Sequence, residues 1–340
     1  MKVNKNSMDK VDVVVSWLDD SDEVWRSDYL KYKYEDGDVD EKANSEARFR
    51  DYGTFKYWFR AMEKNAPWVN KIYLVTAGHF PSWLKKDHPK LELVKHSDFI
   101  PKDYLPTFAS DTIALNLHRI AGLSEHFVYF NDDMFLMNET KVTDFFKNGK
   151  PRDMLTLIPA QTYEKFNHFA INNMNLIHKD FSKKDIMKNA LWKMVNYKAG
   201  IACLGTTLLQ LPYPKISDIH HFHLSTPLTK SLYEKLWKQN YEEFDKTSKH
   251  KFREITDVTD WYIRMYYLVS GDFEPMRMHK FGKFINIKYC DSFDKLFNKK
   301  YKELCLNDDS TMTDAEFLDK KASLNESLSQ KFPKKSSFEY

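Results

Sequence analysis

Short apolar runs alternate with amphipathic segments throughout residues 11–130. The runs VDVVVSWL, KIYLV, LELV and HFVYF are rich in β-branched and aromatic residues, which is typical of buried strands. Between the first two runs, Phe55, Trp58, Phe59 and Met62 recur at the spacing of one helix face. Strands that alternate with helices predict a Rossmann-like α/β fold, with a mostly parallel sheet flanked by helices.

The second half of the chain is expected to be more helical. Residues 180–197 and 229–247 have amphipathic patterns, and residues 257–271 form an aromatic-rich segment typical of a buried helix. Thr313 and Glu316 have the spacing of a capping box at the start of a helix near the C-terminus.

Two further local predictions concern the first half. Residues 31–47 are polar, charged and without periodicity, so we expect an exposed loop there. Ser110 is expected to cap a helix that ends at Gly122.

The composition excludes several classes of protein. The 340 residues include 52 basic and 49 acidic ones, a net charge of +3, which argues against a dedicated nucleic-acid binder. The three cysteines have no CxxC spacing, which argues against a disulfide framework or a structural zinc site. The chain has no signal peptide and no run of about 18 apolar residues, so we expect a cytoplasmic protein, with contact at the inner membrane surface left open.

Two adjacent carboxylates, Asp132 and Asp133, directly follow the apolar run at residues 126–130. Neighbouring like charges repel, and each loses hydration on burial. A divalent cation would neutralise them, and carboxylate oxygens suit Mg²⁺ or Mn²⁺. The alternative is an exposed acidic turn in which Asn131 favours a loop, and both interpretations remain open.

Ligands bind beyond the carboxyl ends of parallel strands, which is where the acid pair and residues 19–22 are expected to lie. Asp12 falls inside an apolar run, where it either binds a partner or flanks the start of the strand. Arg48, Arg50 and Asp51 precede a helix, and they either bind an anion at its N-terminus or form an ordinary charged cap.

The second half offers basic and imidazole groups. His220, His221 and His223 lie close together, but no cysteine or HExxH spacing supports zinc. One of them is expected to act as a general base or phosphate partner, with a packed structural histidine as the alternative. Arg253 has the chemistry to clamp a phosphate, and Asp257 to orient it or the histidine; a solvated helix end is the alternative.

Several of these stretches together resemble the Stealth family. They are VDVVVSWLDDSDEVW, ARFRDYGTFKYWFRAMEKNAPWVNKIYLVTAGHFPSWL, LPTFASDTIALNLHRIAGLSEHFVYFNDDMFL, HLSTPLTKSLYEKLWKQNYEEFDKTSKHKFREITDVT and CLNDDST. The family comprises bacterial capsular and surface polysaccharide phosphotransferases and the catalytic core of the lysosomal-enzyme N-acetylglucosamine-1-phosphotransferase. The resemblance extends over most of residues 10–140 and 220–338.

The resemblance implies a reaction. Such enzymes transfer a sugar together with one phosphate from a nucleotide diphosphate sugar to an acceptor hydroxyl, and they release a nucleoside monophosphate. The implied donor is UDP-linked, the acceptor is a saccharide or lipid-linked saccharide, and the pathway is capsular or cell-surface polysaccharide synthesis. No nucleic-acid partner is implied, and the oligomeric state is not predicted.

The resemblance and the residue patterns together define the expected site. The expected substrate-binding residues are Asp12, Arg48, Arg50, Asp51, His118, Arg119 and Asn131. Asp132 and Asp133 are expected to hold Mg²⁺ or Mn²⁺, and the expected catalytic residues are His223, Arg253 and Asp257. The sequence departs from the family pattern at Ser16 and at SDTIALNLHR, which lacks the usual glutamate and first histidine.

The expected organisation has three segments. Residues 1–150 are expected to form the α/β half that binds the nucleotide sugar, and residues 151–219 a variable helical insertion. Residues 220–340 are expected to form a helical half that completes the active site. Within that site His223 acts either as general base or as covalent nucleophile. Two rival functions remain: a metal-dependent glycosyltransferase and a non-catalytic carbohydrate-binding protein.

Overall fold

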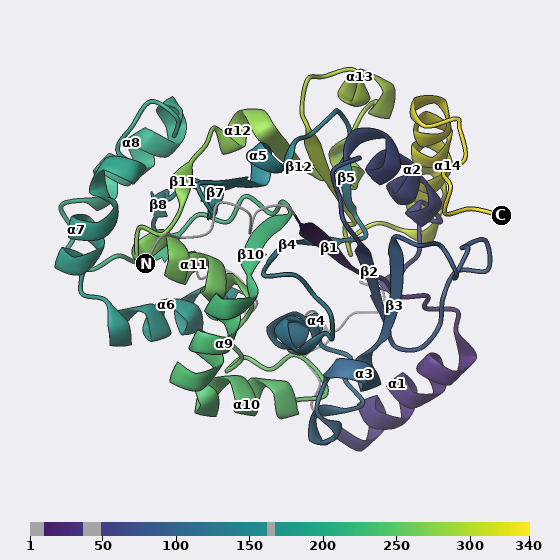
Figure 1. Ribbon diagram of the computed structural model, residues 1–340, viewed down its shortest axis with the longest axis horizontal. Coiled ribbons are helices and arrows are strands. Elements are labelled where there is room, and N and C mark those ends of the chain that lie inside the picture. Colours follow the sequence, from purple (N-terminus) through teal and green to yellow (C-terminus); the bar gives the residue numbers. More distant parts are fainter. Residues whose placement is uncertain (1–9, 37–48, 162–166) are drawn as a thin grey trace.

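The computed structural model describes residues 10–36, 49–161 and 167–340. Arg48 and most of the loop expected at residues 31–47 lie outside these ranges. A central sheet runs through the molecule, and helices cover both of its faces (Figure 1).

The central sheet has five strands in the order β10-β4-β1-β2-β3. Four of them are parallel, namely β1 (Val11–Ser16), β2 (Ile72–Thr76), β3 (Leu91–Lys95) and β4 (His126–Asn131). The fifth, β10 (Thr226–Thr229), runs antiparallel beside β4. The prediction of a mostly parallel sheet flanked by helices is therefore confirmed. Because Ser16 pairs with Asn131, the carboxyl ends of β1 and β4 lie at one level.

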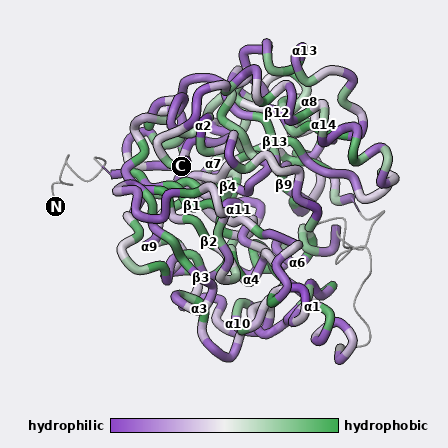
Figure 2. The backbone as a smooth tube through the Cα atoms, turned by 90° about the vertical axis from the view of Figure 1, so that its right-hand side faces the viewer, coloured by the Kyte–Doolittle hydropathy of each residue, from purple (hydrophilic) through white to green (hydrophobic). Residues whose placement is uncertain are grey.

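The strands are apolar along their whole length because both faces of the sheet are covered. Val13 and Val15 of β1 join the core under α2 (Phe55–Asn65), whereas Val14 points to the opposite core. That second core is closed by α4 (Ser110–Asn116), α9 (Lys230–Gln239), α10 (Tyr241–Lys249) and α11 (Trp261–Val269). Figure 2 shows the hydrophobic strands enclosed by more hydrophilic outer segments.

A second sheet joins the C-terminal region to the end of β4. Its strands are β12 (Gly282–Asn286), β13 (Glu303–Asn307) and β5 (Met134–Leu136), in that order. Because β5 follows β4 after a tight turn, pairing with β13 brings the C-terminal region to the acid pair. Short strands complete the fold: β6 (Phe146–Lys147), β7 (Lys150–Asp153), β8 (Leu157–Ile158), β9 (Asp218–Ile219) and β11 (Glu274–Pro275).

The remaining helices lie around the two sheets. The longer ones are α1 (Glu23–Asp36), α6 (His168–Asp180), α7 (Lys183–Met194), α8 (Ile201–Gln210) and α14 (Asp314–Lys331). The short ones are α3 (His96–Phe99), α5 (Val142–Phe145), α12 (Met278–Phe281), α13 (Phe293–Phe297), and the 3₁₀ turns η2 (Lys102–Tyr104), η3 (Leu117–Arg119) and η5 (Ile287–Tyr289).

One local sequence signal located the start of a helix correctly, and another pattern covered two helices. The capping box of Thr313 and Glu316 opens α14, as predicted. The pattern over residues 229–247 corresponds to two helices, because the chain breaks at Asn240, whose amide donates to the Tyr262 hydroxyl at 3.0 Å.

Two local predictions were wrong. Residues 31–36, expected in a loop, belong to α1, whose aromatic residues pack against the loop before α4. Ser110 is the first residue of α4 and makes no cap hydrogen bond; its hydroxyl contacts Arg253 instead. The division of the chain into three segments stays a prediction.

Candidate active site

Three distant parts of the chain meet beyond the carboxyl end of β4. The turn from β4 to β5 contributes Asp133, the segment after β9 contributes His223, and β13 contributes Cys305. One potential ligand atom from each of these side chains lies within 4.8 Å of the other two. This convergence places the acid pair against the second half of the chain, as the sequence predicts.

Asp133 has one carboxylate oxygen that the described protein leaves unsatisfied. Its Oδ2 accepts a hydrogen bond from Cys305 Sγ at 3.3 Å, but its Oδ1 is buried and has no hydrogen-bond partner among the described residues. Burial raises the pKa of this carboxyl, and the nearby His223 partly offsets that rise. A buried oxygen without a partner is costly unless a cation or ligand satisfies it, so the residues fit a divalent cation.

Asp132 lies beside Asp133 among further acids. Burial, followed by the charges of Asp133 and Asp51, raises the pKa of Asp132 to about 8. Burial and the charges of Asp51 and Asp19 also raise the pKa of Asp20. These carboxyls therefore share one environment, whose negative potential attracts a cation.

Cys305 is a site residue that sequence reasoning missed. Burial and the charge of Asp133 raise the pKa of its thiol well above the ordinary value, so it stays a neutral thiol at neutral pH. The converging side chains offer one carboxylate, one imidazole and one thiol, and the adjacent Asp132 adds a second carboxylate. We infer that the role of Cys305 is to position Asp133.

His223 is held in an unusual backbone conformation. Its φ of 53° lies in the left-handed region, and its N–H donates to His221 Nδ1 at 3.1 Å. Two residues on, the backbone N–H and the hydroxyl of Ser225 both donate to Glu303 at 2.6 Å. Glu303 thus ties the His223 segment to β13, the strand that also contains Cys305.

Burial lowers the pKa of His223, with opposing effects from two neighbours. The carboxylate of Asp133 raises it, and the guanidinium of Arg253 lowers it. The imidazole is therefore neutral at neutral pH and able to accept a proton. The nearby carboxylate stabilises the imidazolium that results.

Arg253 is fixed by the start of α4. Its Nε donates to Asp111 Oδ2 at 3.0 Å, and its Nη2 contacts the Ser110 hydroxyl. Asp260, which the sequence reasoning missed, belongs to the same group: burial and the charge of Asp111 raise its pKa to about 7, and Arg253 opposes that rise. Arg253 therefore brings a positive charge to the neighbourhood of His223.

Asp257 faces a different histidine from the one expected. Its Oδ1 lies 2.6 Å from His250 Nδ1, and its Oδ2 accepts the Glu254 N–H at 2.7 Å. It is almost fully buried within the loop that contains Arg253. Its contacts indicate that Asp257 shapes this loop, so we propose it as a positioning residue for Arg253.

Asp51 belongs to the acid cluster, and Arg50 precedes it in the chain. Arg50 Nε donates to Asp308 Oδ2 at 3.0 Å, and its Nη2 donates to the Asp309 carbonyl at 3.1 Å. Asp51 accepts the Gly53 N–H at 2.8 Å and raises the pKa of Asp132. Arg50 thus connects this segment to the residues after β13. Asp51 and Asn131, the last residue of β4, belong to the edge of the sheet where the acidic residues lie.

Asp12 lies at the opposite end of the sheet. It is the second residue of β1, and it pairs with Phe127 near the amino end of β4. Its buried carboxylate accepts hydrogen bonds from Asn70 Nδ2 at 2.7 Å, from the Lys71 N–H at 3.2 Å and from the Ser124 N–H at 2.8 Å. The structure therefore does not bring Asp12 to the acid pair, and its contacts are those of a residue that fixes the loops before β2 and β4.

His118 and Arg119 are also remote from the acid pair. They lie in η3, after α4 and before the amino end of β4. His118 stacks on Tyr233 with ring centroids 5.6 Å apart, and the Arg119 guanidinium lies 4.6 Å from the Trp237 ring centroid. Both therefore pack against α9.

Replacing His118 by phenylalanine is expected to reduce the acid sensitivity of the fold without changing turnover. Burial, followed by the charges of Arg119 and Lys230, lowers the pKa of His118 from 6.5 to about 3. The unfolded chain binds a proton there near pH 6.5 and the folded chain does not until about pH 3, so stability falls as pH falls through this window. Between pH 7 and pH 5 the unfolding free energy of the variant should therefore fall by about 2 kcal/mol less than that of the wild type.

Urea unfolding at the two pH values measures this difference. An unchanged pH dependence combined with lost turnover would assign the His118 imidazole to the reaction instead.

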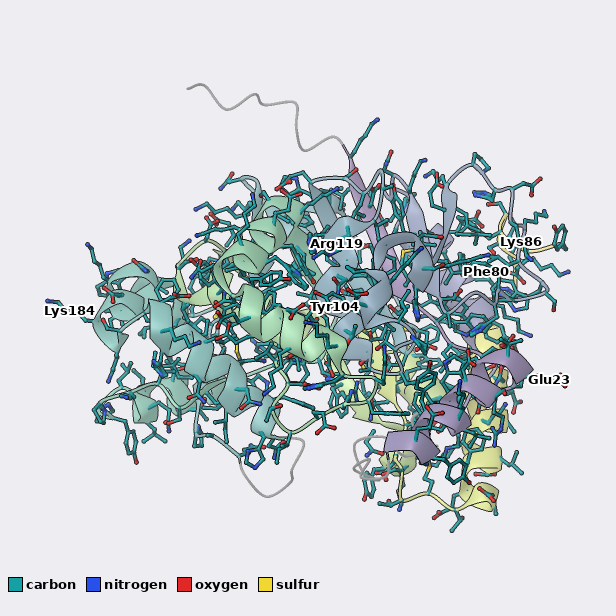
Figure 3. The ribbon with its side chains drawn as sticks, turned by 90° about the horizontal axis from the view of Figure 1, so that it is seen from below. Glu23, Phe80, Lys86, Tyr104, Arg119 and Lys184 are labelled. Carbon is teal, nitrogen blue, oxygen red and sulfur yellow. The ribbon has the colours of Figure 1, made fainter. Side chains whose placement is uncertain are left out.

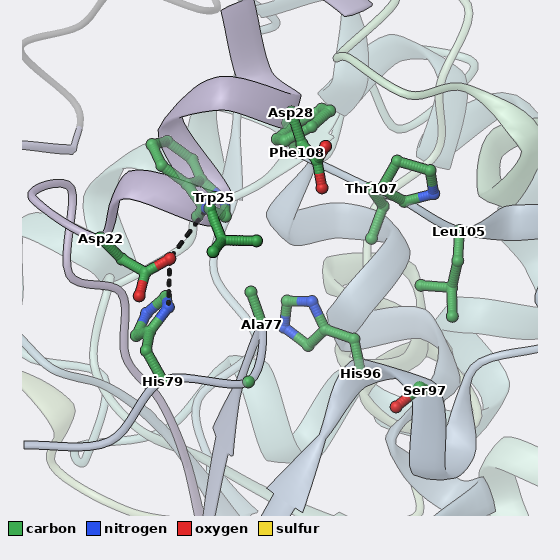
Figure 4. Close-up of a pocket in the computed structure, with 13 residues that line it drawn as sticks. Asp22, Trp25, Asp28, Ala77, His79, His96, Ser97, Leu105, Thr107 and Phe108 are labelled. Carbon is green, nitrogen blue, oxygen red and sulfur yellow. Dashed lines mark hydrogen bonds and ion pairs between the residues drawn. The ribbon is translucent and has the colours of Figure 1, made fainter.

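A cavity of about 380 Å³ lies along the same edge of the central sheet, beyond the carboxyl ends of β2 and β3. Figure 4 shows the imidazoles of His79 and His96 across it from Trp25 and Phe108. His79 Nε2 accepts the Asp19 N–H at 2.9 Å, so the cavity adjoins the acidic segment after β1. Burial lowers the pKa of His96 to about 4 and also lowers that of His79, so both imidazoles are uncharged at neutral pH.

An acid cluster with an orphaned oxygen, opposed by a neutral imidazole and a guanidinium, is typical of enzymes that act on phosphorylated substrates. Known proteins of similar sequence agree with this class. The chain is 39% identical over 340 residues to capsular polysaccharide phosphotransferase WcwK of Streptococcus pneumoniae, covering 98% of this chain and 99% of that protein. It is 40% identical over 336 residues to receptor polysaccharide phosphotransferase WefC of Streptococcus gordonii, with the same coverage.

Two further comparisons concern a conserved region and a solved structure. Residues 48–153 match Stealth protein CR2, conserved region 2. The galactosyltransferase LgtC, solved with donor and acceptor sugar analogues, aligns over 92% of this chain and 96% of its own, with 10% identity and a TM-score of 0.36. The chain belongs to the Stealth family.

Proposed function

We propose that the protein is a phosphotransferase that moves a sugar 1-phosphate from a nucleotide diphosphate sugar to an acceptor hydroxyl in capsular or cell-surface polysaccharide synthesis. The observation that supports this most is the unpartnered, buried Oδ1 of Asp133 beside His223. The relatives named as capsular and receptor polysaccharide phosphotransferases support the same reaction.

Asp132 and Asp133 are the residues that would hold the divalent cation, Mg²⁺ or Mn²⁺. When bound, such an ion neutralises charge on a diphosphate and eases departure of the nucleoside monophosphate. Cys305 keeps one oxygen of Asp133 in place, and the surrounding acids raise the local affinity for cations.

His223 takes the proton of the acceptor hydroxyl in this proposal. The hydroxyl oxygen bonds to the sugar-linked phosphorus, the bond from that phosphorus to the nucleotide oxygen breaks, and the nucleoside monophosphate leaves. The sugar keeps its own bond to the transferred phosphate, so its anomeric configuration does not change. We propose the role of general base, with that of covalent nucleophile as the alternative, because burial keeps the imidazole neutral and able to accept a proton.

Arg253 supplies positive charge to the transferred phosphoryl group. Asp111 and Ser110 fix its guanidinium, so little reorganisation is needed during the reaction. A preorganised contact of this kind contributes about 3 kcal/mol to the stabilisation of a transition state.

The cavity beyond β2 and β3 is proposed to receive the nucleoside of the donor. It lies on the same edge as the acid cluster, and its walls offer aromatic rings and uncharged imidazoles. A nucleotide lying along this edge would place its base against Trp25 and Phe108 and its phosphates near Asp132.

Replacing Ala77 by leucine is expected to raise the KM for the donor about 10-fold with little change in kcat. Ala77 is exposed and lines the cavity, so a larger side chain fills the space without disturbing the core. Steady-state kinetics with varied donor measure the effect, and Ala315→Leu on the exposed face of α14 is the matched control. An unchanged KM in Ala77→Leu would show that the nucleoside does not bind in this cavity.

The proposed setting is the cytoplasm, at the inner face of the membrane. All three cysteines are unpaired in the structure, which fits a reducing compartment. A saccharide or lipid-linked saccharide acceptor fits this setting, and a UDP-linked sugar is the proposed donor.

The experiment that tests the function is incubation of the purified protein with a panel of sugar nucleotides, with Mg²⁺ or Mn²⁺, and a saccharide acceptor. The proposal expects one donor to release its nucleoside monophosphate, and chelation of the metal to abolish the release. Release of a nucleoside diphosphate would contradict it.

A further inference from the structure

Large apolar side chains gather on the surface of one lobe of the molecule, formed by α7, α8 and the segments that follow them, residues 183–215. Among the described residues, fourteen large hydrophobic side chains are exposed, and six of these fall between positions 192 and 213. They are Trp192, Tyr197, Ile201, Leu208, Leu209 and Tyr213. Concentrated exposure of this kind marks an interaction surface.

The exposed residues lie on defined helix faces. Lys188 and Trp192 are four residues apart on α7, and Ile201 and Leu208 are seven apart on α8, so each pair shares a face. Ile201 is 94% exposed and Trp192 is 82% exposed. The opposite face of α7 is buried through Ile186, Ala190 and Met194. The apolar surface is therefore an additional face that the core does not use.

The lobe is firmly attached to the rest of the molecule. Lys193 Nζ donates to the Gly271 carbonyl at 2.7 Å and to the Phe273 carbonyl at 2.5 Å. Thr207 Oγ1 accepts the Leu157 N–H at 3.1 Å, which ties α8 to β8. The exposed side chains are thus presented by a fixed framework.

The lobe is also basic. Residues 183–215 contain six lysines and one aspartate, a net charge of +5; since the whole chain has +3, the remainder has −2. Lys184, Lys188 and Lys215 are exposed on the same lobe as the apolar side chains. Figure 3 shows Lys184 at the outer edge of the molecule. Apolar and aromatic residues that share a lobe with lysines match an interface between lipid headgroups and acyl chains.

We propose that the α7–α8 lobe docks on the surface of an anionic phospholipid bilayer. Its lysines contact headgroup phosphates, and Trp192, Ile201 and Leu209 enter the upper acyl region. No helix among the described residues has the length and apolar character to cross a bilayer. α8 has ten residues and is about 15 Å long, half of the apolar thickness of a bilayer, so the lobe lies on the surface.

Docking would hold the candidate active site near the bilayer. α8 packs against β8, β8 pairs with β9, and His223 follows β9 by four residues. A lipid-linked acceptor would then reach the site from the surface on which the lobe rests. This consequence rests on the proposed function, whereas the docking itself does not.

Flotation of the full-length protein with lipid vesicles tests the proposal without any substrate. Vesicles of phosphatidylcholine alone are compared with vesicles containing 30% phosphatidylglycerol, at low and high salt. We expect binding to the anionic vesicles, and at least a 10-fold loss at high salt because screening weakens the contribution of the lysines.

Two triple variants separate the contributions. Trp192→Ser with Ile201→Ser and Leu209→Ser should weaken binding about 100-fold, and Lys184→Gln with Lys188→Gln and Lys215→Gln should remove the preference for anionic lipid. Tyr34→Ser with Tyr289→Ser and Leu318→Ser is the control, since these side chains are 81%, 73% and 61% exposed elsewhere on the protein and their loss should leave binding unchanged.

Turnover with a soluble acceptor should be the same in all variants, which separates docking from catalysis. Wild-type protein that stays unbound with anionic vesicles would overturn the proposal. So would a lobe variant that binds vesicles as the wild type does. A wild-type dimer that the apolar lobe variant converts to a monomer, with no change in vesicle binding, would assign the surface to self-association instead.

Discussion

Replacing Asp133 by asparagine is expected to lower turnover by about 10³-fold while the fold stays intact. Asparagine has nearly the same shape and can still accept the hydrogen bond from Cys305. It removes the negative charge beside the unpartnered Oδ1, and with it the strongest ligand for a cation. Mn²⁺ affinity, measured by electron paramagnetic resonance, should fall together with turnover.

Asp12→Asn is the matched control, because Asp12 is a buried aspartate at the other end of the same sheet. Loss of its charge weakens three hydrogen bonds, so the unfolding free energy should fall by about 2 kcal/mol. Turnover per folded molecule should stay near the wild-type rate. The opposite pattern, with Asp133→Asn active and Asp12→Asn inactive but stable, would move the site to the other end of the sheet.

Replacing His223 by asparagine is expected to lower turnover by roughly 10²–10⁴-fold, the usual contribution of a general base. Asparagine tolerates a positive φ, so the backbone at 53° should be retained. His88→Asn is the matched control, because His88 precedes β3 at the amino end of the sheet and bonds to Ser337 at 3.0 Å. Metal affinity should stay near wild type in both variants.

A second readout separates the two roles of His223. With a donor labelled in the sugar-linked phosphate and no acceptor present, a covalent nucleophile accumulates label on the protein. A general base leaves the protein unlabelled, which is the outcome we expect. Wild-type turnover in His223→Asn would exclude both roles.

Much of the fold could be predicted because its signals are local. The apolar runs located β1, β2, β3 and β4 of the central sheet but not β10, and the spacing of Phe55, Trp58, Phe59 and Met62 defined α2. The acid pair was located correctly because it directly follows a strand whose carboxyl end opens onto the site. These inferences needed only residues near one another in sequence.

The contribution of β13 could not be predicted, because it depends on pairing between strands far apart in the chain. Met134 and Cys305 are paired neighbours across β5 and β13, and no local pattern specifies that register. Glu303 likewise reaches Ser225 only through the folded arrangement. The positions of these residues became clear only from the structure.

The position of a residue along its strand or helix would have shown which expected site residues lie at the amino end of the sheet and which lie at the carboxyl end. Asp12 is the second residue of its strand, so its carboxyl lies at the amino end of a parallel sheet, away from the binding edge. His118 follows α4 and precedes β4, which also places it at the amino end of that strand. The order of elements in the sequence contains this information, although residue type alone does not.

Attack at phosphorus is tested most directly with a donor sugar nucleotide that contains phosphorus-32 only in the phosphate attached to the sugar. After incubation with acceptor and Mn²⁺, we predict that the label is in the saccharide product, within a phosphodiester, and that the released nucleoside monophosphate is unlabelled. Label recovered in a nucleoside diphosphate, with a plain glycosidic bond in the product, would contradict the account.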